Sequence, residues 1–262
     1  MNLCNKDRPV RFSYVRIASP KQSDFFRHMH SEYELLLTLS GGASYVIEDK
    51  KYILNPYTLL LIPPKAYHFP HIEDTDLYCR YMVAFNEGAT KNSLLKAVYQ
   101  QPACYQLDEN HPIIESFRQL HVLSQTDMGE HENLMLKTYC TQILLNILVL
   151  QQETSTSRAP AERTLPYPVL PYIEENLTKI KSLDEIAEHF FLSPSTLTHQ
   201  FKSQMGISLM KFIRQKKLLL ARSMLEKGEK PLEVAVKCGF SEYTTFYKAY
   251  IRFFGVAPSK SD

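Results

Sequence analysis

The spacing of apolar residues divides this chain into a strand-rich front and a helical rear. From Val10 to about Phe85, short apolar runs alternate with turn signals such as Gly41-Gly42. Runs of this length, bounded by Gly, Pro, Asn and Asp, are typical of β-strands. Many short strands without intervening helices predict a β-sandwich or small barrel. The clearest predicted strands are Tyr33–Leu39, Ala43–Glu48, Leu59–Ile62 and Leu77–Phe85.

Helical periodicity follows, with one helix expected over Pro112–Ser124 and a second over Glu130–Gln152. The second helix carries an apolar seam at alternating spacings of four and three residues, which is typical of a coiled coil but spans only about two heptads. Two interpretations fit this seam: it pairs with a second copy of the chain, or it packs on the β-domain. The seam consists of Leu136, Cys140, Ile143, Ile147 and Leu150.

A polar stretch rich in Ser and Thr separates these helices from the last third of the chain. Residues 153–166 show no hydrophobic periodicity, which predicts an interdomain linker. The expected organisation is a β-domain at 1–110, a helical dimerisation segment at 111–152, the linker, and an all-α domain of two helix-turn-helix units at 167–262. The fold class is therefore α+β with two domains.

The all-α domain begins with a predicted helix, tight turn and second helix. Ser182 and Glu185 form a capping box, so a helix should begin there. Ser193 followed by Pro194 combines an N-cap with proline at the first helical position, which opens the next helix. This second helix is expected to expose Ser195, Thr198, His199 and Lys202.

The same pattern returns between Pro231 and Tyr250. Pro231 opens a helix, Gly239 supplies a turn where a side chain would be costly, and Ser241 is expected to cap the second helix. Paired helix-turn-helix units read two stretches of major groove, so the doubled pattern predicts a protein that binds double-stranded DNA. The exposed face of this second unit is expected to be Tyr243, Thr244, Tyr247 and Lys248.

Between the two units, Ser208–Lys227 predicts one long helix closed by Gly228. Its lysines Lys216 and Lys217 are expected to face solvent and, together with Lys202, to contact phosphates, which position a protein on DNA without reading sequence. Charge supports this interpretation. The whole chain carries a net charge of +2, but 11 Lys and Arg stand against 4 Asp and Glu between Lys202 and Arg252. Phosphate contacts need such a local excess of positive charge.

Other classes of protein receive less support. The 5 cysteines are scattered and include no Cys-x-x-Cys, so no disulfide framework or zinc knuckle is expected. The N-terminus has no apolar core of a signal peptide and no run reaches the length of a membrane span, which predicts a cytoplasmic protein without a membrane partner. No nucleotide-binding glycine loop or Ser/His/Asp signature is present, so no enzyme is expected.

Two segments of the C-terminal part resemble the AraC/XylS family of bacterial transcription regulators. They are Leu192–Phe201 and the set of Gly239-Phe240, Phe246 and Gly255-Val256-Ala257-Pro258. The resemblance implies a homodimeric activator that works with RNA polymerase and carries a cupin-type sensor for a small effector. The departures from the family pattern include Phe191, which stands where a small turn residue is usual, and Ile251, which stands where a lysine is usual.

The β-domain contains a run that resembles the first cupin motif: His28, His30, Glu34 and Gly41. Pro63 and His68 resemble the second motif, but Tyr57 and Lys65 stand where that motif has glycines. Three interpretations fit the histidines and the carboxylate: contacts to a polar effector such as a sugar, a structural role inherited with the fold, or a site for Fe, Mn, Ni or Zn. Effector contact is expected, with no metal and no cofactor. Tyr45, Tyr67 and Arg80 are candidate wall residues of the effector site.

The sequence therefore predicts a one-component, ligand-responsive transcription regulator. Two alternatives remain open at this point. One is a metal-dependent cupin enzyme with a helical appendage, and the other is an effector-independent regulator whose barrel serves only to dimerise.

Overall fold

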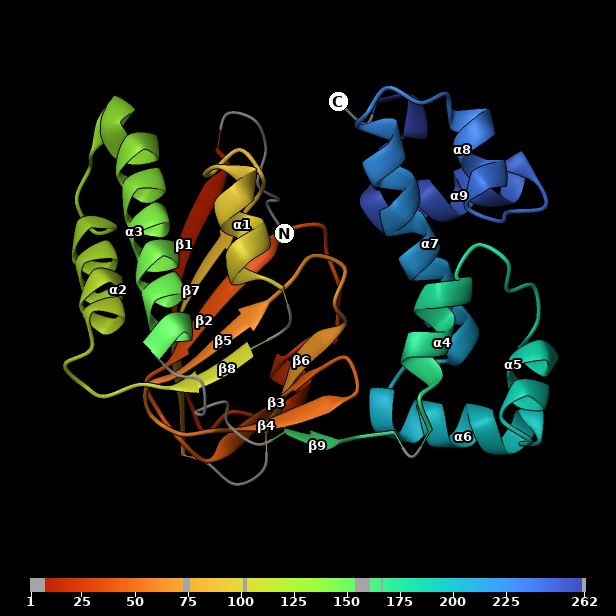
Figure 1. Ribbon diagram of the computed structural model, residues 1–262, viewed down its shortest axis with the longest axis horizontal. Coiled ribbons are helices and arrows are strands. Elements are labelled where there is room, and N and C mark those ends of the chain that lie inside the picture. Colours follow the sequence, from red (N-terminus) through yellow and green to blue (C-terminus); the bar gives the residue numbers. More distant parts are fainter. Residues whose placement is uncertain (1–7, 73–75, 101–102, 154–160, 166, 261–262) are drawn as a thin grey trace. The chain divides into compact units, whose positions relative to one another are not determined.

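The computed structural model describes residues 8–72, 76–100, 103–153, 161–165 and 167–260 (Figure 1). The chain divides into an N-terminal unit, Met1–Glu162, and a C-terminal unit, Arg163–Asp262. The N-terminal unit is rich in strands and the C-terminal unit is helical, as the sequence predicts. Each unit has its own hydrophobic core.

Two antiparallel sheets form the N-terminal unit. The larger sheet has the strand order β1-β7-β2-β5-β8, and the smaller has the order β6-β3-β4-β9. The strands are β1 (Val10–Ala18), β2 (Tyr33–Thr38), β3 (Ala43–Ile47), β4 (Lys50–Leu54), β5 (Thr58–Ile62), β6 (His68–Ile72), β7 (Leu77–Phe85), β8 (Ala103–Gln106) and β9 (Ala161–Arg163). A short 3-10 helix, η1, spans Gln22–Asp24.

Both faces of the larger sheet are buried. Successive side chains of a strand point to opposite faces, so Leu36 packs between the two sheets while its neighbours Leu35 and Leu37 pack under the helices. The same division holds on β5, where Leu60 faces the second sheet and Leu61 faces the helices. This double burial explains why these strands read as continuous apolar runs and not as alternating ones.

Three helices belong to the N-terminal unit: α1 (Asn92–Val98), α2 (Pro112–Leu123) and α3 (Glu132–Glu153), the last preceded by the 3-10 turn η2 (Gly129–His131). Figure 1 shows α2 and α3 side by side along the face of the larger sheet. The bounds of α2 and α3 agree with the predicted helices to within two residues, whereas α1 was not predicted. The sequence of α1 is short and has no capping residue that would have announced it.

The seam assigned to dimerisation is the core face of α3. Cys140, Ile143 and Ile147 are fully buried against the sheet, Leu150 is buried with them, and Leu136 packs on the edge of the same cluster. The interpretation as a subunit seam is therefore wrong, because these side chains already cover the barrel of their own chain. The stretch Gly129–Glu153 is nevertheless long and apolar enough to cross a membrane by length and composition, which corrects the expectation that no run reaches that length.

The predicted linker lies only partly within the described residues. Residues 154–160 fall outside them, and Ala161–Arg163 forms the short strand β9 beside β4.

The C-terminal unit contains α4 (Val169–Asn176), α5 (Leu183–His189), α6 (Pro194–Met205), α7 (Leu209–Leu225), α8 (Pro231–Lys237) and α9 (Tyr243–Phe254), then the 3-10 turn η3 (Pro258–Lys260). Ser182 accepts a hydrogen bond from the backbone amide of Glu185, and Ser193 accepts one from the amide of Thr196, so both predicted caps are confirmed. The predicted cap at Ser241 is wrong: Glu242 is the N-cap of α9 and makes no side-chain capping bond.

The first helix pair (α5 and α6) and the second helix pair (α8 and α9) turn in the same way. The amide of Leu192 donates to the carbonyl of Ala187, and the amide of Phe240 donates to the carbonyl of Ala235. The residue before each donor has a positive φ: 55° at Phe191 and 74° at Gly239. Phe191 therefore occupies a backbone conformation that favours glycine, and its side chain is 95% exposed.

Candidate functional site

The second helix of the first helix pair presents a polar face. On α6, Leu197 and Phe201 are buried, which leaves Ser195, His199 and Lys202 exposed and Thr198 half-buried. Proline at its first position and the Ser193 cap define where α6 begins, so the rotation of this face follows directly from the sequence. The placement of these four residues on an accessible face agrees with the prediction.

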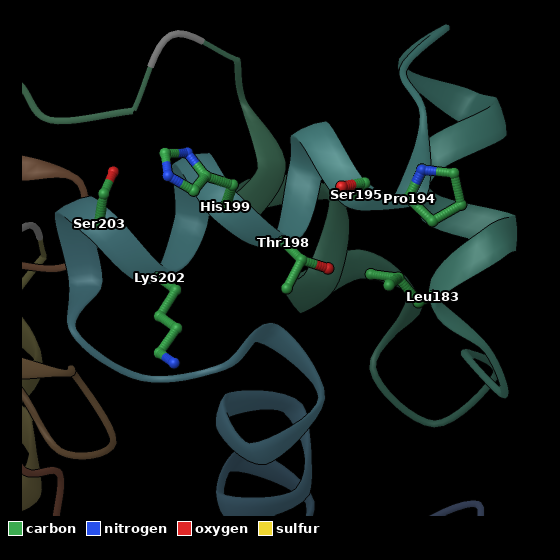
Figure 2. A pocket seen from close by; sticks show the side chains of 7 residues that line it. All are labelled: Leu183, Pro194, Ser195, Thr198, His199, Lys202 and Ser203. Carbon is green, nitrogen blue, oxygen red and sulfur yellow. The ribbon is translucent and has the colours of Figure 1, made fainter.

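An open depression runs along this face, and Figure 2 shows the residues around it. Thr198 and Lys202 project from one side of α6, whereas His199 and Ser203 project from the other. Leu183, at the start of α5, contributes to one end of the depression. The face is thus hollowed and polar, and it offers short hydrogen-bonding groups to a partner. The lining residues are Leu183, Pro194, Ser195, Thr198, His199, Lys202 and Ser203.

The second helix pair presents a matching face on α9. Phe246 and Tyr250 are fully buried, as Leu197 and Phe201 are on α6. Counting from these buried pairs, Thr244, Tyr247 and Lys248 correspond to Ser195, Thr198 and His199, and all three are exposed. Tyr243 is half-buried, with its ring 5.9 Å from that of Phe246 and 6.0 Å from that of Tyr247.

One position differs sharply between the two faces. By the same correspondence Lys202 matches Ile251, which is exposed. The α6 face therefore carries a cation where the α9 face carries an apolar side chain.

Two of the three lysines assigned to phosphate contacts do not lie on the surface. Lys216 and Lys217 are only 6% and 7% exposed. The ammonium group of Lys217 donates to the carbonyl oxygens of Ile180, at 2.8 Å, and Gly239, at 3.2 Å, while Lys216 lies 3.4 Å from a carboxylate oxygen of Glu174. The prediction that they face solvent is wrong because α7 is packed from both sides by the two helix pairs. The middle of such a helix has no solvent face.

Other cations of the C-terminal unit fit the phosphate role. On α6, α7 and α9, five cations are exposed, and none of the five makes an ion pair with another described residue. Lys211 and Arg214, near the start of α7, were not among the predicted contacts, although the polar positions of that helix pointed to them. The five exposed cations are Lys202, Lys211, Arg214, Lys248 and Arg252.

In the N-terminal unit, the four residues of the cupin-like motifs come together. One potential ligand atom from each of His28, His30, Glu34 and His68 lies within 4.8 Å of all the others. His30, Glu34 and His68 are buried, and His28 is half-buried. Glu34 points between the sheets because it alternates with Leu35 on β2, on the same face as Leu36. The predicted convergence of these side chains is confirmed, whereas their role is not decided by proximity.

The backbone holds the three imidazoles in place. His28 and His68 form an isolated β-bridge, with the amide of His68 donating to the carbonyl of His28 at 2.9 Å. The Nδ1 atoms of His28, His30 and His68 lie 2.8, 3.2 and 2.9 Å from the carbonyl oxygens of Phe26, Glu32 and Ala66. All three rings therefore have one nitrogen engaged by main chain.

Burial and mutual contacts shift the protonation of this cluster. Burial, helped by the charge of His68, lowers the pKa of His28 to about 4, which keeps that ring neutral near pH 7. Burial acts to raise the pKa of Glu34, but its contacts with His30 and His68 outweigh burial and hold it well below its usual range. Burial opposes protonation of His30 as well, yet the neighbouring Glu34 raises the pKa of that ring.

Two positions where the cupin motif has glycines keep the backbone conformation that glycine favours. Tyr57 has a φ of 65° and Lys65 a φ of 66°, in the left-handed region. The amide of Lys65 donates to the carbonyl oxygen of His30 at 2.7 Å, which ties this turn to the cluster. The missing glycines therefore do not alter the turn that precedes His68, since Lys65 adopts the left-handed conformation that glycine favours.

Of the three candidate wall residues, two face the cluster and one does not. The buried ring of Tyr45 stacks with that of His68, their centroids 6.2 Å apart, and Arg80 extends between the sheets, where its Nε atom has no hydrogen-bond partner. Tyr67 precedes His68 and packs its ring on Phe69, so it points to the other side of the strand. Tyr78, one alternation from Arg80 on β7, was missed although its buried hydroxyl group has no partner and faces the same interior.

Comparison with known proteins agrees with both halves of this description. A helix-turn-helix domain model matches residues 186–261, and the model of an AraC-like ligand binding domain matches residues 13–144. The HTH-type transcriptional activator RhaS of Escherichia coli O139:H28 is 27% identical over 248 residues, which cover 90% of this chain and 87% of that protein. The crystal structure of ToxT from Vibrio cholerae O395 aligns over 96% of both chains at 12% identity, with a TM-score of 0.38.

Proposed function

This chain belongs to the AraC family of transcriptional regulators, and on that premise we propose that it is a one-component activator controlled by a small effector. It is a DNA-binding regulator with a ligand-binding domain and not an enzyme, which answers the alternative of a catalytic cupin. Activation is proposed because the related RhaS is named a transcriptional activator. An activator of this kind works in the cytoplasm, on the chromosome, and contacts RNA polymerase.

We propose that α6 and α9 read two adjacent major grooves. The observation that carries this proposal is the pair of matching polar faces, since Ser195 and His199 on α6 have exposed counterparts in Thr244 and Lys248 on α9. Figure 1 shows these two helices toward opposite ends of α7, so one rigid helix would hold both reading heads. Short hydroxyl groups suit single hydrogen bonds or contacts to the thymine methyl group, not bidentate reading of guanine.

The first helix pair should contribute more affinity than the second. Lys202 supplies a cation beside the reading face of α6, whereas the corresponding Ile251 on α9 cannot bind a phosphate. Phosphate contacts supply much of the affinity of DNA-binding proteins, so α9, with one contact fewer, should contribute less affinity for DNA.

The test is selection of bound duplexes from a random DNA pool by the purified protein, followed by footprinting of the selected site. The expected footprint covers two adjacent major grooves, and alanine at Ser195 or His199 should weaken binding more than alanine at Thr244 or Tyr247. Glu175→Gln, on the exposed side of α4, serves as the control and should leave the footprint unchanged. Absence of any enriched sequence, or equal damage from both helices, contradicts the assignment.

We also propose a homodimer formed through the outer side of α3. Its inner side covers the barrel, but Leu134, Leu145 and Val149 are large apolar residues exposed on the same helix. Isolated apolar residues are common on surfaces, yet a row of them along one helix marks an interaction site. The partner proposed for this row is the same row of a second chain, because a two-fold interface uses one patch twice.

The effector is proposed to bind between the sheets, near Tyr45, Tyr78 and Arg80. Partner-free polar atoms of Tyr78 and Arg80 would otherwise remain buried without hydrogen bonds, at a cost of about 1–3 kcal/mol each. A polar ligand that satisfies both groups would recover this energy.

A further inference from the structure

The histidine cluster holds more acceptors than donors. Each Nδ1 atom of His28, His30 and His68 approaches a backbone carbonyl oxygen, and a carbonyl can only accept a hydrogen bond. The ring proton of each neutral imidazole therefore resides on Nδ1. The three Nε2 atoms are left with lone pairs and no proton.

The group that faces these lone pairs is another acceptor. Nε2 of His30 lies 3.0 Å from Oε1 of Glu34, and Nε2 of His68 lies 3.4 Å from Oε2. Neither contact has the direction of a ring N–H bond, so both buried Nε2 atoms lack a hydrogen-bond partner despite the short distance. A buried polar group without a partner is unfavourable. Two such nitrogens around one carboxylate require a positively charged species between them.

Protons alone do not satisfy the cluster. A proton on Nε2 of His30 would form a hydrogen bond to one oxygen of Glu34. A bond from His68 to the other oxygen needs a second proton, which would place two imidazolium rings side by side. The ring centroids are 4.9 Å apart for His30 and His68 and 4.4 Å apart for His28 and His68. A single metal cation between the ligand atoms would engage every lone pair at once, while each imidazole ring stays neutral.

The spacing of the ligand atoms suits an ion and excludes a sugar at this position. Ligand bonds of about 2.0–2.2 Å put neighbouring ligand atoms about 3.0–3.5 Å apart around a metal. The observed separations of 3.0 and 3.4 Å fall in that range. Four ligand atoms within 4.8 Å of one another leave room for an ion, but not for a six-carbon ring.

The geometry points to a metal site: we propose that His28, His30, Glu34 and His68 bind one divalent transition-metal ion. Imidazole nitrogen suits Zn, Fe and Ni, and the carboxylate widens the set to Mn, whereas Mg and Ca prefer an all-oxygen shell. A main-chain carbonyl on the remote nitrogen of each imidazole is the arrangement that orients metal-binding histidines. This differs from the expectation drawn from the sequence, where the missing glycines at Tyr57 and Lys65 counted against a metal; their positive φ values remove that objection.

The metal site would add to the proposed sensor function. Its part in sensing the effector rests on that proposed function, whereas metal binding itself does not. An ion at Glu34 would lie in the interior that Tyr45 and Arg80 border, so it would help to bind a polar effector or act as the signal itself. Metal binding is measurable without DNA, and DNA binding is measurable on metal-free protein. The failure of one proposal is therefore distinguishable from the failure of the other.

The test is calorimetric titration of the full-length, chelator-stripped protein with ZnCl₂, NiCl₂, MnCl₂ and anaerobic FeCl₂, with MgCl₂ and CaCl₂ as controls. At least one transition metal should bind at one ion per chain, while Mg and Ca should not compete. Glu34→Gln preserves the shape of the side chain and should weaken binding by more than about 100-fold, beyond the loss typical of residues that only support a ligand. His131→Ala removes a histidine of the same unit that is 71% exposed, and it should leave binding unchanged.

A second measurement keeps the test independent of how the variants fold. X-ray absorption of the zinc-loaded wild-type protein should show imidazole ligands at about 2.0–2.1 Å and no sulfur. The absence of transition-metal binding to the folded wild-type protein would overturn the proposal. Sulfur ligands, or unchanged affinity in a folded Glu34→Gln protein, would overturn it equally.

Discussion

The ammonium group of Lys217, on α7, donates a hydrogen bond of 3.2 Å to the carbonyl oxygen of Gly239. The same group donates to the carbonyl oxygen of Ile180, which precedes α5, at 2.8 Å. The side chain of one lysine thereby joins the segment that precedes α5 to the turn between α8 and α9. This contact lets Lys217 connect the two helix pairs, in place of the phosphate contact that its polarity suggested.

Replacing Lys217 by Met should destabilise the C-terminal unit without changing its electrostatic contacts to DNA. The methionine keeps the apolar stem but leaves the carbonyl groups of Ile180 and Gly239 without this donor, at a cost of about 1–3 kcal/mol for the buried carbonyl group of Ile180. Urea unfolding of the full-length protein measures the loss. The salt dependence of DNA binding should keep its slope at temperatures where the variant is folded.

Lys211→Ala is the matched comparison, since Lys211 is an exposed cation on the same helix. Its stability should be unchanged, but the slope of log affinity against log salt should fall by about one unit if it touches a phosphate. The assignment fails if Lys217→Met lowers the salt slope while Lys211→Ala leaves it unaltered.

Phe191→Gly should stabilise the first helix pair. A non-glycine residue in the left-handed conformation costs roughly 1–2 kcal/mol, and the Phe191 side chain is too exposed to recover that energy by packing. The greater freedom of glycine in the unfolded chain offsets part of the gain. Denaturant midpoints of the variant and the wild type measure the difference, and a lower midpoint would show that Phe191 makes a contact that outweighs its strain.

Gly239→Ala provides the opposite case at the equivalent turn. Its added Cβ would overlap the carbonyl oxygen of Thr178, in a backbone conformation with a φ of 74°. We expect this variant to be strongly destabilised in the same assay.

His199→Ala should reduce affinity for the selected site by about 1–3 kcal/mol and relax preference at one base position. Ile251→Lys should raise affinity for every sequence, because it adds a cation at the position on α9 that corresponds to Lys202 on α6. Quantitative binding to the selected site and to single-base variants separates the two effects. A uniform loss across all sites from His199→Ala would reassign that residue to backbone contact.

The double variant Leu145→Glu and Val149→Glu should yield a folded monomer. Both residues are exposed on α3, so their replacement leaves the core intact while placing charges in the proposed subunit interface. Sedimentation and circular dichroism on the same sample report the mass and the fold. A dimer that persists in this variant would move the interface to another surface.

Ile143→Glu supplies the contrast. Ile143 is fully buried against the sheet, so an unpaired carboxylate there should unfold the N-terminal unit. A folded monomer from Ile143→Glu would contradict the assignment of that residue to the core.

Predictions from the sequence succeeded where the deciding interactions are local. Ser182 and Ser193 cap their helices because the accepting hydroxyl and the donating amide are three residues apart, a relationship that the sequence displays directly. The predicted strands hold for the same reason, since an apolar run between turn signals needs no distant partner to be recognised. The short helix α1 escaped prediction because it has neither a capping side chain nor a full apolar stripe.

Where the deciding interactions join residues far apart in the sequence, the environment of a side chain was set by tertiary packing. The apolar seam of α3 was visible in the sequence, but only the position of the sheet shows that Ile143 and Ile147 cover their own barrel while Leu145 faces outward. Lys217 carries a charge that favours solvent in any local interpretation. Helix pairs on both sides of α7 bury it, and two carbonyl groups distant in sequence make that burial tolerable.

The sequence by itself determined the doubled helix-turn-helix units, the strand-rich front and the identity of the four clustered side chains. Those features depend on residue type and spacing along one element. Only the tertiary structure decided which nitrogen of each imidazole is free and what it faces, because Phe26, Glu32 and Ala66 offer their carbonyl groups only once the sheets are closed. The chemistry of the cluster depends on that orientation, which no spacing in the chain encodes.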